Sequence, residues 1–284
     1  MDKEIILEII KSALREDLGD GDHTSLSTIP ANAKGKAKLL IKEDGVVAGV
    51  ELAKEIFKEV DQELSVEVLI QDGTEVKYGD IVLYVYGSVR SILVAERLVL
   101  NTMQRMSGIA TTTFNIVKRL ADTDTKVLDT RKTTPNLRYL EKWAVRIGGG
   151  VNHRFGLYDM ILIKDNHVDY AGGIKNAVQA AQNYLTETNK KLQIEVEVRN
   201  LTELKEVLEI GGVDRVLLDN FEFEDLREAV KLVNKTVLTE ASGGITPENA
   251  LEYAKCGVDY ISMGALTHSV KSLDMSLKAV VNEN

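Results

Sequence analysis

The stretch from residue 131 to residue 167 carries an excess of positive side chains within an acidic chain. Seven lysines and arginines stand against three acids, a balance of 7 − 3 = +4, whereas the whole chain has a formal net charge of −9. The cations are Arg131, Lys132, Arg138, Lys142, Arg146, Arg154 and Lys164, and the acids are Glu141, Asp159 and Asp165. Such a local excess, set among Gly, Thr and Asn, predicts a pocket for a small anion of several charges.

These cations fall into two groups with different expected roles. Arg138, Lys142 and Arg146 repeat every four residues, which is typical of a solvated basic helix face. The other cations follow or end apolar segments, so they are the better candidates for anion binding. These candidates are Arg131, Lys132, His153, Arg154 and Lys164.

Acidic and small residues supply the other groups that could do chemistry. Glu195 or Glu197, which alternation places on the same side of IEVEV, and Asp219 could hold sugar hydroxyls, a divalent metal or a developing cation. The alternative is that these acids form salt bridges with nearby lysines. Ser242-Gly243-Gly244 precedes Thr246-Pro247-Glu248, which predicts a helix start capped by Thr, and together with Gly264 it predicts a phosphate site.

Repeated βα units must position these groups. Six short apolar runs end in polar residues and are followed by helical stretches, and they are KVLDTR, MILIKD, LQIEVEV, RVLLDN, VLTEASGG and YISMGA. This alternation predicts a parallel sheet that closes, perhaps incompletely, into a barrel of six or seven strands. The polar residues then gather at the carboxyl ends of the strands, where barrel enzymes place their chemistry.

The segment before the barrel reads as a separate α+β layer. The first twenty or so residues predict an amphipathic helix, and four strand-like runs with one helical run follow up to about residue 88. From Ser88 to about Leu120 the apolar periodicity predicts one long helix, or two helices joined near Gly108.

Composition limits the classes of function. Hydrophobic residues make up 44% and charged residues 28% of 284 residues, as in soluble globular proteins, and the acidic balance argues against nucleic acid and anionic membranes as partners. A single cysteine, Cys256, excludes an internal disulfide, and the chain has no CxxC or HExxH pattern typical of zinc sites. No apolar run approaches ~18 residues and no signal peptide is recognisable, so we expect a cytoplasmic protein.

Long motifs of this chain closely resemble the quinolinate phosphoribosyltransferase family, also called carboxylating nicotinate-nucleotide pyrophosphorylases. The motifs are LDTRKTTPNLR, EKWAVRIGGGVNHRFGLYDMILIKDNH, EVEV, LLDNF, EASGGIT and ISMGALTHS. The resemblance extends from EDLGDGDHTS to LTHS. The chain departs from the family pattern at Asn136, where Gly is usual, and at Trp143, where Tyr is usual; neither change removes a charge that the chemistry needs, although an effect on specificity is left open.

The resemblance implies an α/β fold and an activity. The fold would be an N-terminal α/β sandwich over residues 1–110, completed by the C-terminal tail 268–284, and an incomplete α/β barrel over residues 111–267. The reaction would join quinolinate and phosphoribosyl pyrophosphate, with Mg²⁺, to give nicotinate mononucleotide, pyrophosphate and CO₂. The active unit would be at least a homodimer with a shared active site.

The resemblance also implies a role for each matching residue. Quinolinate would be bound by Arg105 (which in this family reaches the site from a neighbouring subunit), Arg131, His153, Arg154 and Lys164. Phosphoribosyl pyrophosphate would be bound by Lys132, Thr133, Glu197, Asp219, Ser242, Gly243, Gly244, Gly264 and Ala265. The catalytic residues would be Lys132, Glu197 and Asp219, and the latter two would hold Mg²⁺ directly or through water.

Three other interpretations stay open at this point. Lys164 ends a barrel strand beside other cations, as the Schiff-base lysine of an aldolase would. A relative with the same fold could act on another heterocycle, as in the molybdenum-locus homologues. A non-enzymatic, phosphate-binding regulatory barrel is the third, but it gives no reason for acids to share the pocket with so many cations.

Overall fold

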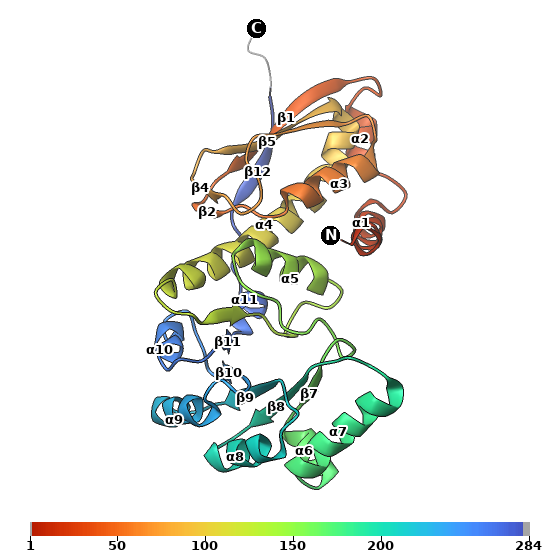
Figure 1. The fold of residues 1–284 in the computed structure, drawn as a ribbon. Helices are drawn as coiled ribbons and strands as arrows, with labels where there is room; N and C mark the ends of the chain where they lie inside the picture. Colours follow the sequence, from red (N-terminus) through yellow and green to blue (C-terminus); the bar gives the residue numbers. More distant parts are fainter. Residues whose placement is uncertain (1, 281–284) are drawn as a thin grey trace. The chain divides into compact units, whose positions relative to one another are not determined.

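The computed structural model describes residues 2–280, and the chain divides into two compact units (Figure 1). The first unit contains Met1–Phe114, Thr134–Gly149 and Ser269–Asn284. The second contains Asn115–Thr133 and Gly150–His268. Because each unit is built from separate stretches of sequence, the chain passes between them several times.

A four-stranded antiparallel sheet of order β12-β1-β5-β3 forms the centre of the first unit. Its strands are β1 (Lys34–Ile41), β3 (Ser65–Val68), β5 (Ile81–Ser88) and β12 (Met275–Ala279). In β1 the alternation of residue types turns Ala37, Leu39 and Ile41 into the core. The blue strand β12 lies beside β1 (Figure 1), so the C-terminal segment adds the edge strand of this sheet. A small pair, β2 (Gly45–Val46) and β4 (Glu75–Val76), lies apart from it.

Helices cover this sheet, and the predicted first helix is confirmed. The helices of the unit are α1 (Lys3–Leu18), α2 (His23–Thr28), α3 (Val50–Val60) and α5 (Arg138–Ile147), together with most of α4 (Val89–Arg119). In α1 the apolar stripe buries Ile6 and Ile10. The strand expected in GVVAGV is shorter than predicted, because Gly49 adopts a left-handed backbone (φ 95°) and Val50 already begins α3.

The long helix α4 is a single helix of 31 residues, which decides between the two predicted alternatives. Gly108 does not break it. Instead, the backbone oxygen of Lys271 occupies the space that a Cβ at residue 108 would need. In α5 the solvated-face interpretation is wrong for Lys142, which is only 2% exposed, because its neighbours Glu141, Ala144 and Val145 are buried as well. None of the helices in the described part of the chain is long and apolar enough to cross a membrane.

Six parallel strands in the order β6-β11-β10-β9-β8-β7 form the second unit. They are β6 (Lys126–Leu128), β7 (Ile161–Ile163), β8 (Ile194–Val198), β9 (Arg215–Asp219), β10 (Leu238–Ser242) and β11 (Tyr260–Ser262). Strands β6 and β7 are the two edges, so the incomplete barrel that the sequence predicts is confirmed with six strands.

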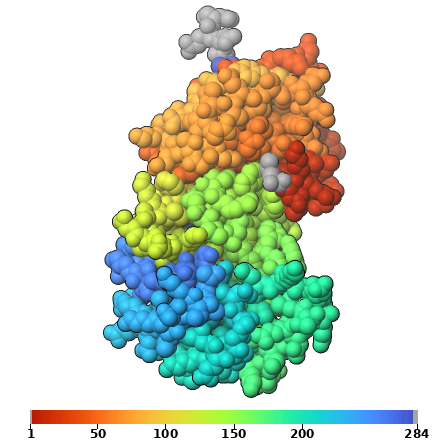
Figure 2. Space-filling view, in the orientation of Figure 1, coloured from red at the N-terminus to blue at the C-terminus, as the bar shows by residue number. Residues whose placement is uncertain are grey.

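Helices follow the strands of the second unit as the βα pattern predicts. They are α6 (Asp165–Ala171), α7 (Ile174–Thr188), α8 (Leu201–Ile210), α9 (Phe223–Val233), α10 (Ala250–Ala254) and α11 (Ala265–His268). On the face shown in Figure 2, the green-to-blue atoms of the segment from α7 to α9 form much of this unit's surface. The strands are thus covered along their length, and their carboxyl ends carry the polar residues described next.

Candidate active site

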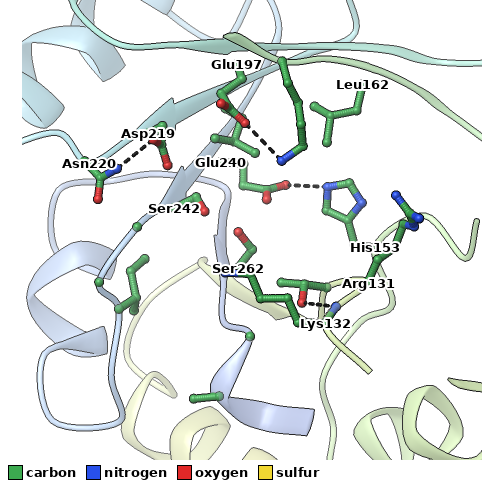
Figure 3. A pocket seen from close by; sticks show the side chains of 18 of the residues that line it. Arg131, Lys132, His153, Leu162, Glu197, Asp219, Asn220, Glu240, Ser242 and Ser262 are labelled. Carbon is green, nitrogen blue, oxygen red and sulfur yellow. Dashed lines mark hydrogen bonds and ion pairs between the residues drawn. The ribbon is translucent and has the colours of Figure 1, made fainter. Parts of the chain in front are cut away.

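A cavity of about 820 Å³ lies at the carboxyl ends of the six parallel strands (Figure 3). Every candidate residue named from the sequence lines it except Arg105, Thr133 and Glu195, the alternative to Glu197 on β8. The candidates that the fold brings together are Arg131, Lys132, His153, Arg154, Lys164, Glu197, Asp219, Ser242, Gly243, Gly244, Gly264 and Ala265. They come from strand ends far apart in sequence, and the parallel sheet brings these ends to one edge.

Cations gather on one side of the cavity. In Figure 3, Arg131 and His153 lie on the opposite side from Asp219 and Ser242. Burial, followed by the neighbouring positive charge of Arg131, lowers the pKa of the Arg154 guanidinium. Two guanidinium groups that repel each other in this way favour an anion between them. This side of the cavity therefore suits a ligand with carboxylate groups.

Asp129 holds the segment that carries His153 and Arg154. This fully buried carboxylate, directly after β6, accepts hydrogen bonds from the backbone N–H of His153 (2.8 Å) and from Nδ2 of Asn152 (2.5 Å). Val151 also pairs with Leu128 as an isolated parallel bridge. The sequence analysis missed Asp129, although its position at a strand end in LDTR was the available signal.

His153 is buried between two carboxylates. Its Nε2 lies 3.0 Å from Oε2 of Glu195 and 3.3 Å from Oε2 of Glu240, and its Nδ1 accepts the backbone N–H of Arg154 at 2.7 Å. Because Nδ1 accepts that N–H, it carries no proton of its own, and the ring proton lies on Nε2, where it faces the two carboxylates.

Acids and an amide form the other side of the cavity. Glu197 lies near the carboxyl end of β8, on the same face as Glu195, and its Oε2 is 3.5 Å from Nζ of Lys164. The Nδ2 of Asn220 donates to Oδ2 of Asp219 (2.7 Å), while its backbone N–H donates to the oxygen of Ser242 (2.8 Å). Asn220 therefore orients Asp219, and its left-handed backbone (φ 54°) is a conformation that Asn tolerates well. The motif LLDNF contained this residue, but its role was not predicted.

Two glycines permit close approach of the chain at the cavity. Gly243 has a φ of 96°, and the side-chain amide of Asn220 occupies the space of a Cβ there. At Gly264 a Cβ would lie 2.8 Å from Cδ of Lys132 and 3.0 Å from Cδ2 of His268. Larger residues at either position would displace side chains that line the cavity.

The predicted helix start at Thr246 is wrong. Residues 247–249 form a turn, in which the side chain of Asn249 accepts the N–H of Thr246 (2.7 Å), and α10 begins only at Ala250. The side-chain oxygen of Asn249 competes with regular capping at Thr246. The phosphate-site prediction therefore rests on the glycine loop itself and not on a helix N-terminus.

Arg105 and Thr133 do not line the cavity. Arg105 belongs to the first unit, where its Nε lies 2.8 Å from Oε1 of the buried Glu141 and its Nη2 donates to Oγ1 of Thr134 at 2.9 Å. The backbone N–H of Thr133 donates to the oxygen of Arg131 (2.9 Å) and so shapes the loop before Thr134. The guanidinium of Arg105 is thus held in a fixed orientation by its own chain.

Glu197 and Asp219 have the donor chemistry that Mg²⁺ prefers. Both are carboxylates at the ends of adjacent strands, β8 and β9, and both line the cavity. Hard oxygen ligands of this kind suit Mg²⁺, which usually keeps several of its waters. The residues present therefore fit a magnesium ion bound together with a phosphorylated substrate.

Comparisons with known proteins agree with this geometry. The C-terminal domain model of quinolinate phosphoribosyl transferase matches residues 109–278, and the N-terminal domain model matches residues 22–107. The chain is 49% identical over 287 residues to the chloroplastic, carboxylating nicotinate-nucleotide pyrophosphorylase of Oryza sativa subsp. japonica, covering 95% of this chain and 76% of the relative. It is 45% identical to the probable enzyme of that name from Methanocaldococcus jannaschii, covering 98% of both chains.

Solved structures show the same likeness in three dimensions. NadC from Streptococcus pyogenes superposes with a TM-score of 0.93 at 39% identity and covers 99% of both chains. The nicotinate-nucleotide pyrophosphorylase from Francisella tularensis gives a TM-score of 0.92 at 38% identity, covering 99% of this chain and 98% of its own. On the evidence of both domain models and of these relatives, the chain belongs to the quinolinate phosphoribosyltransferase family.

Proposed function

We propose that the cavity of the second unit transfers the phosphoribosyl group of phosphoribosyl pyrophosphate to quinolinate, with decarboxylation, in the de novo biosynthesis of NAD. The products are nicotinate mononucleotide, pyrophosphate and CO₂. The observation that carries this assignment is one cavity that combines several cations (Arg131, Lys132, Arg154 and Lys164) with two acids at strand ends (Glu197 and Asp219) and a glycine loop (Gly243-Gly244). A pyridine dicarboxylate fits the cations, and a phosphorylated sugar fits the acids and the glycine loop.

The cations bind and orient the acceptor. Arg131, Arg154 and Lys164 hold the two carboxylates of quinolinate, with His153 beneath them, so that the ring nitrogen faces the ribose. The nitrogen attacks C1 of the ribose as the bond to pyrophosphate breaks, through a transition state with oxocarbenium character. Placing both reactants in one geometry lowers the barrier chiefly by removing their freedom of motion.

The acids and Lys132 stabilise the charges that develop. Glu197 and Asp219 face the forming cation, and Lys132 faces the departing pyrophosphate. Mg²⁺, when bound at Glu197 and Asp219, neutralises phosphate charge. The ribosylated ring is a pyridinium, which accepts the electron pair left at C2 when the C2–carboxylate bond breaks, and C2 then takes up a proton. Release of CO₂ therefore needs no further cofactor.

Incubation with quinolinate, phosphoribosyl pyrophosphate and Mg²⁺ tests this function. Pyrophosphate and CO₂ should be released in equal amounts, and neither should form when quinolinate is omitted. Release of pyrophosphate without CO₂ would instead indicate transfer to another acceptor. The aldolase alternative is not favoured, because Nζ of Lys164 lies 3.5 Å from Oε2 of Glu197, and a carbonyl substrate would have to break this ion pair to reach the amine.

We further propose Mg²⁺ as the cofactor, a homo-oligomer of at least two chains and a cytoplasmic location. The donor set of Glu197 and Asp219 supports the metal. The fixed guanidinium of Arg105, outside the set of cavity-lining residues, supports a site completed by a second chain. The single cysteine of the chain supports a reducing compartment, although the Oryza sativa relative is described as chloroplastic.

Removing the charge of either acid should abolish most of the turnover. Asp219→Asn and Glu197→Gln preserve side-chain size, so we expect folding to survive while kcat falls by roughly 10²-fold or more. Quinolinate affinity, measured by calorimetry, should change little. The matched control is Glu203→Gln, which removes the charge of a half-buried acid that pairs with Arg199 outside the cavity lining of the same unit, and it should leave kcat unchanged. Loss of quinolinate binding with turnover intact would reverse the assigned roles.

A side chain at residue 243 should weaken binding of phosphoribosyl pyrophosphate. Gly243→Ala forces a Cβ into the space of the Asn220 amide and strains a left-handed backbone, so the loop must move. We expect the KM for phosphoribosyl pyrophosphate to rise more than the KM for quinolinate. Gly211→Ala has a similar φ of 70° but nothing within 4 Å of the new Cβ, so it controls for backbone strain alone. The same KM for phosphoribosyl pyrophosphate in Gly243→Ala and Gly211→Ala would argue against binding of that substrate by the glycine loop.

A further inference from the structure

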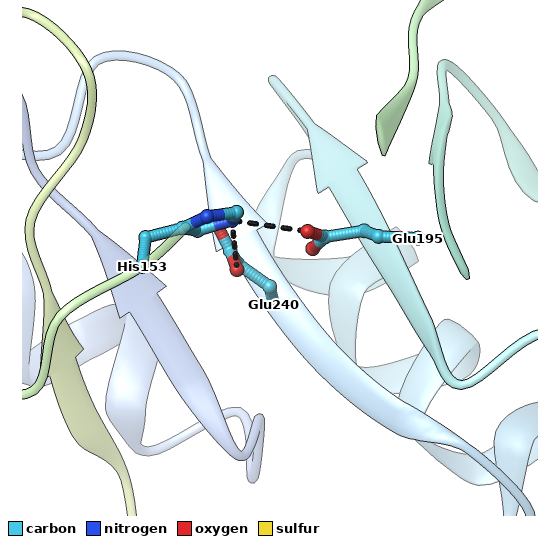
Figure 4. A group of neighbouring side chains, drawn as sticks. All are labelled: His153, Glu195 and Glu240. Atoms are coloured by element: carbon cyan, nitrogen blue, oxygen red, sulfur yellow. Dashed lines mark ion pairs between the residues drawn. The ribbon is translucent and has the colours of Figure 1, made fainter. Parts of the chain in front are cut away.

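Four ionisable side chains are packed together in the interior of the second unit, and two of them, His153 and Glu240, also line the cavity. Glu195 and Glu240 have no exposed surface, and Arg215 and His153 are only 8% and 9% exposed. His153 lies between the two carboxylates (Figure 4). Nη1 of Arg215 lies 3.0 Å from Oε2 of Glu240, and its Nε lies 4.0 Å from Oε1 of Glu195. We call these four residues the buried charge cluster.

Strand pairing sets the positions of the residues in the buried charge cluster. Glu195 on β8 pairs in register with Arg215 on β9, and Glu240 on β10 pairs with Tyr260 on β11. The guanidinium carbon of Arg215 lies 4.5 Å from the centre of the Tyr260 ring. The neighbouring strands β8, β9, β10 and β11 thus each contribute a side chain to one layer of the barrel interior. His153 packs against this layer.

Stability does not explain the cluster. Both side-chain oxygens of Glu195, Oε1 of Glu240 and Nε of Arg215 are buried without a hydrogen bond in the described part of the chain. Buried ion pairs with unsatisfied atoms are often no more stabilising than apolar residues of the same size. A cluster of this kind in a barrel core therefore needs a functional reason.

A metal ion does not supply that reason. The nearest ligand atoms of His153, Glu195 and Glu240 lie within 4.8 Å of one another, a spacing that would also suit a cation. However, Arg215 already provides a positive charge next to Glu240, and the cavity above contains Arg131 and Arg154. A divalent ion there would leave an excess of positive charge in a buried region.

We infer that Glu195 is a positioning residue for quinolinate binding, acting through His153 and Arg154. Glu195 does not line the cavity, but it contacts Nε2 of His153, and Nδ1 of the same ring accepts the backbone N–H of Arg154. The carboxylate therefore orients the ring through its ion pair with Nε2, and the ring accepts a hydrogen bond from the backbone that carries the Arg154 side chain. This inference rests on the proposed function of the cavity, because it assigns the cations to quinolinate.

Removing the charge of Glu195 should weaken the binding of quinolinate but not that of phosphoribosyl pyrophosphate. Glu195→Gln keeps the size of the side chain but loses its charge, so we expect the KM and the dissociation constant of quinolinate to rise about tenfold. The KM for phosphoribosyl pyrophosphate should stay within about twofold. Glu195→Asp retains the charge on a shorter side chain. Its KM and dissociation constant for quinolinate should therefore lie between those of the wild type and of Glu195→Gln.

Asp259→Asn is the matched control. The carboxylate of Asp259, just before β11, accepts the N–H (2.8 Å) and Oγ1–H (2.7 Å) of Thr239 at the opposite end of the strands from the cavity. This variant should lower the melting temperature without changing either KM. If Glu195→Gln does not fold, the double variant Glu195→Gln with Arg215→Gln removes one charge of each sign. The KM values for the two substrates are then compared in that double variant.

The outcomes are distinguishable. A wild type that does not bind quinolinate in calorimetry contradicts the proposed function itself. A wild type that binds it, with Glu195→Gln binding equally well or losing affinity for both substrates alike, contradicts the positioning role. A selective loss of quinolinate affinity, partly restored in Glu195→Asp, supports it, because a merely structural role would not distinguish the two substrates.

Discussion

Quinolinate should be consumed and nicotinate hardly at all. Nicotinate lacks one of the two carboxylates, so the cations that bind that group would be left unpaired beside the bound ligand, at a cost of about 2–5 kcal/mol. Burial, followed by the positive charge of Arg131, lowers the pKa of Arg154, and the repulsion between the two guanidinium groups makes the missing carboxylate costly. The measurement is kcat/KM for each acceptor, from pyrophosphate release at saturating phosphoribosyl pyrophosphate.

Arg154→Met provides the control for this discrimination. Methionine retains much of the packing volume but removes the charge, so kcat/KM for quinolinate should fall steeply while the low value for nicotinate changes little. The preference for quinolinate should therefore narrow. Comparable turnover of nicotinate by the wild type would refute the assignment of the cations to two carboxylates.

Two inactive variants should restore activity when they are mixed. If Arg105 completes the quinolinate pocket of a neighbouring chain, Arg105→Ala and Lys132→Ala are each nearly inactive alone. In a mixed dimer one site carries both substitutions and the other carries neither. Random exchange makes about half of the dimers mixed, which gives at most about a quarter of the wild-type sites. The measurement needs mild dissociation, reassociation and a pyrophosphate assay.

Arg97→Ala is the matched control, because Arg97 is an exposed arginine on the same helix, α4. This variant should be fully active alone, and Arg105→Ala should fold normally, since Glu141 retains its hydrogen bond from the N–H of Thr134 (3.1 Å). If exchange is demonstrated by mass and no activity returns, Arg105 acts within its own chain and the shared site is wrong.

The positions at strand ends could be predicted because parallel strands have one chemical direction. Once the runs ending at Lys164, Glu197 and Asp219 were assigned to β-strands, the sheet had to bring those residues to the same edge, and they do line one cavity. The apolar period predicted the extent of the helical region of α4, although it left open whether Gly108 divides it into two helices. Each of these inferences uses only the order of residues within one element.

Contacts between elements were not predictable in the same way. The sequence offered Glu195 and Glu197 as alternatives on one face of β8, but their depths differ: Glu195 contacts His153 in the interior, whereas Glu197 reaches the cavity. That difference depends on the register of β8 with β9, where Glu195 pairs with Arg215. The burial of Lys142 likewise depends on how α5 packs, which charge spacing along a helix does not encode.

The pairing of β12 with β1 also sets an order of events during synthesis. A ribosome releases β1 early, but residues 275–279 emerge only after the whole of the second unit. Until then one edge of the nascent N-terminal sheet presents unpaired backbone groups, which is the kind of edge that recruits strands from other chains. Completion of the first unit therefore waits for synthesis of the second, and a chain that terminates prematurely after the barrel keeps an open, aggregation-prone edge.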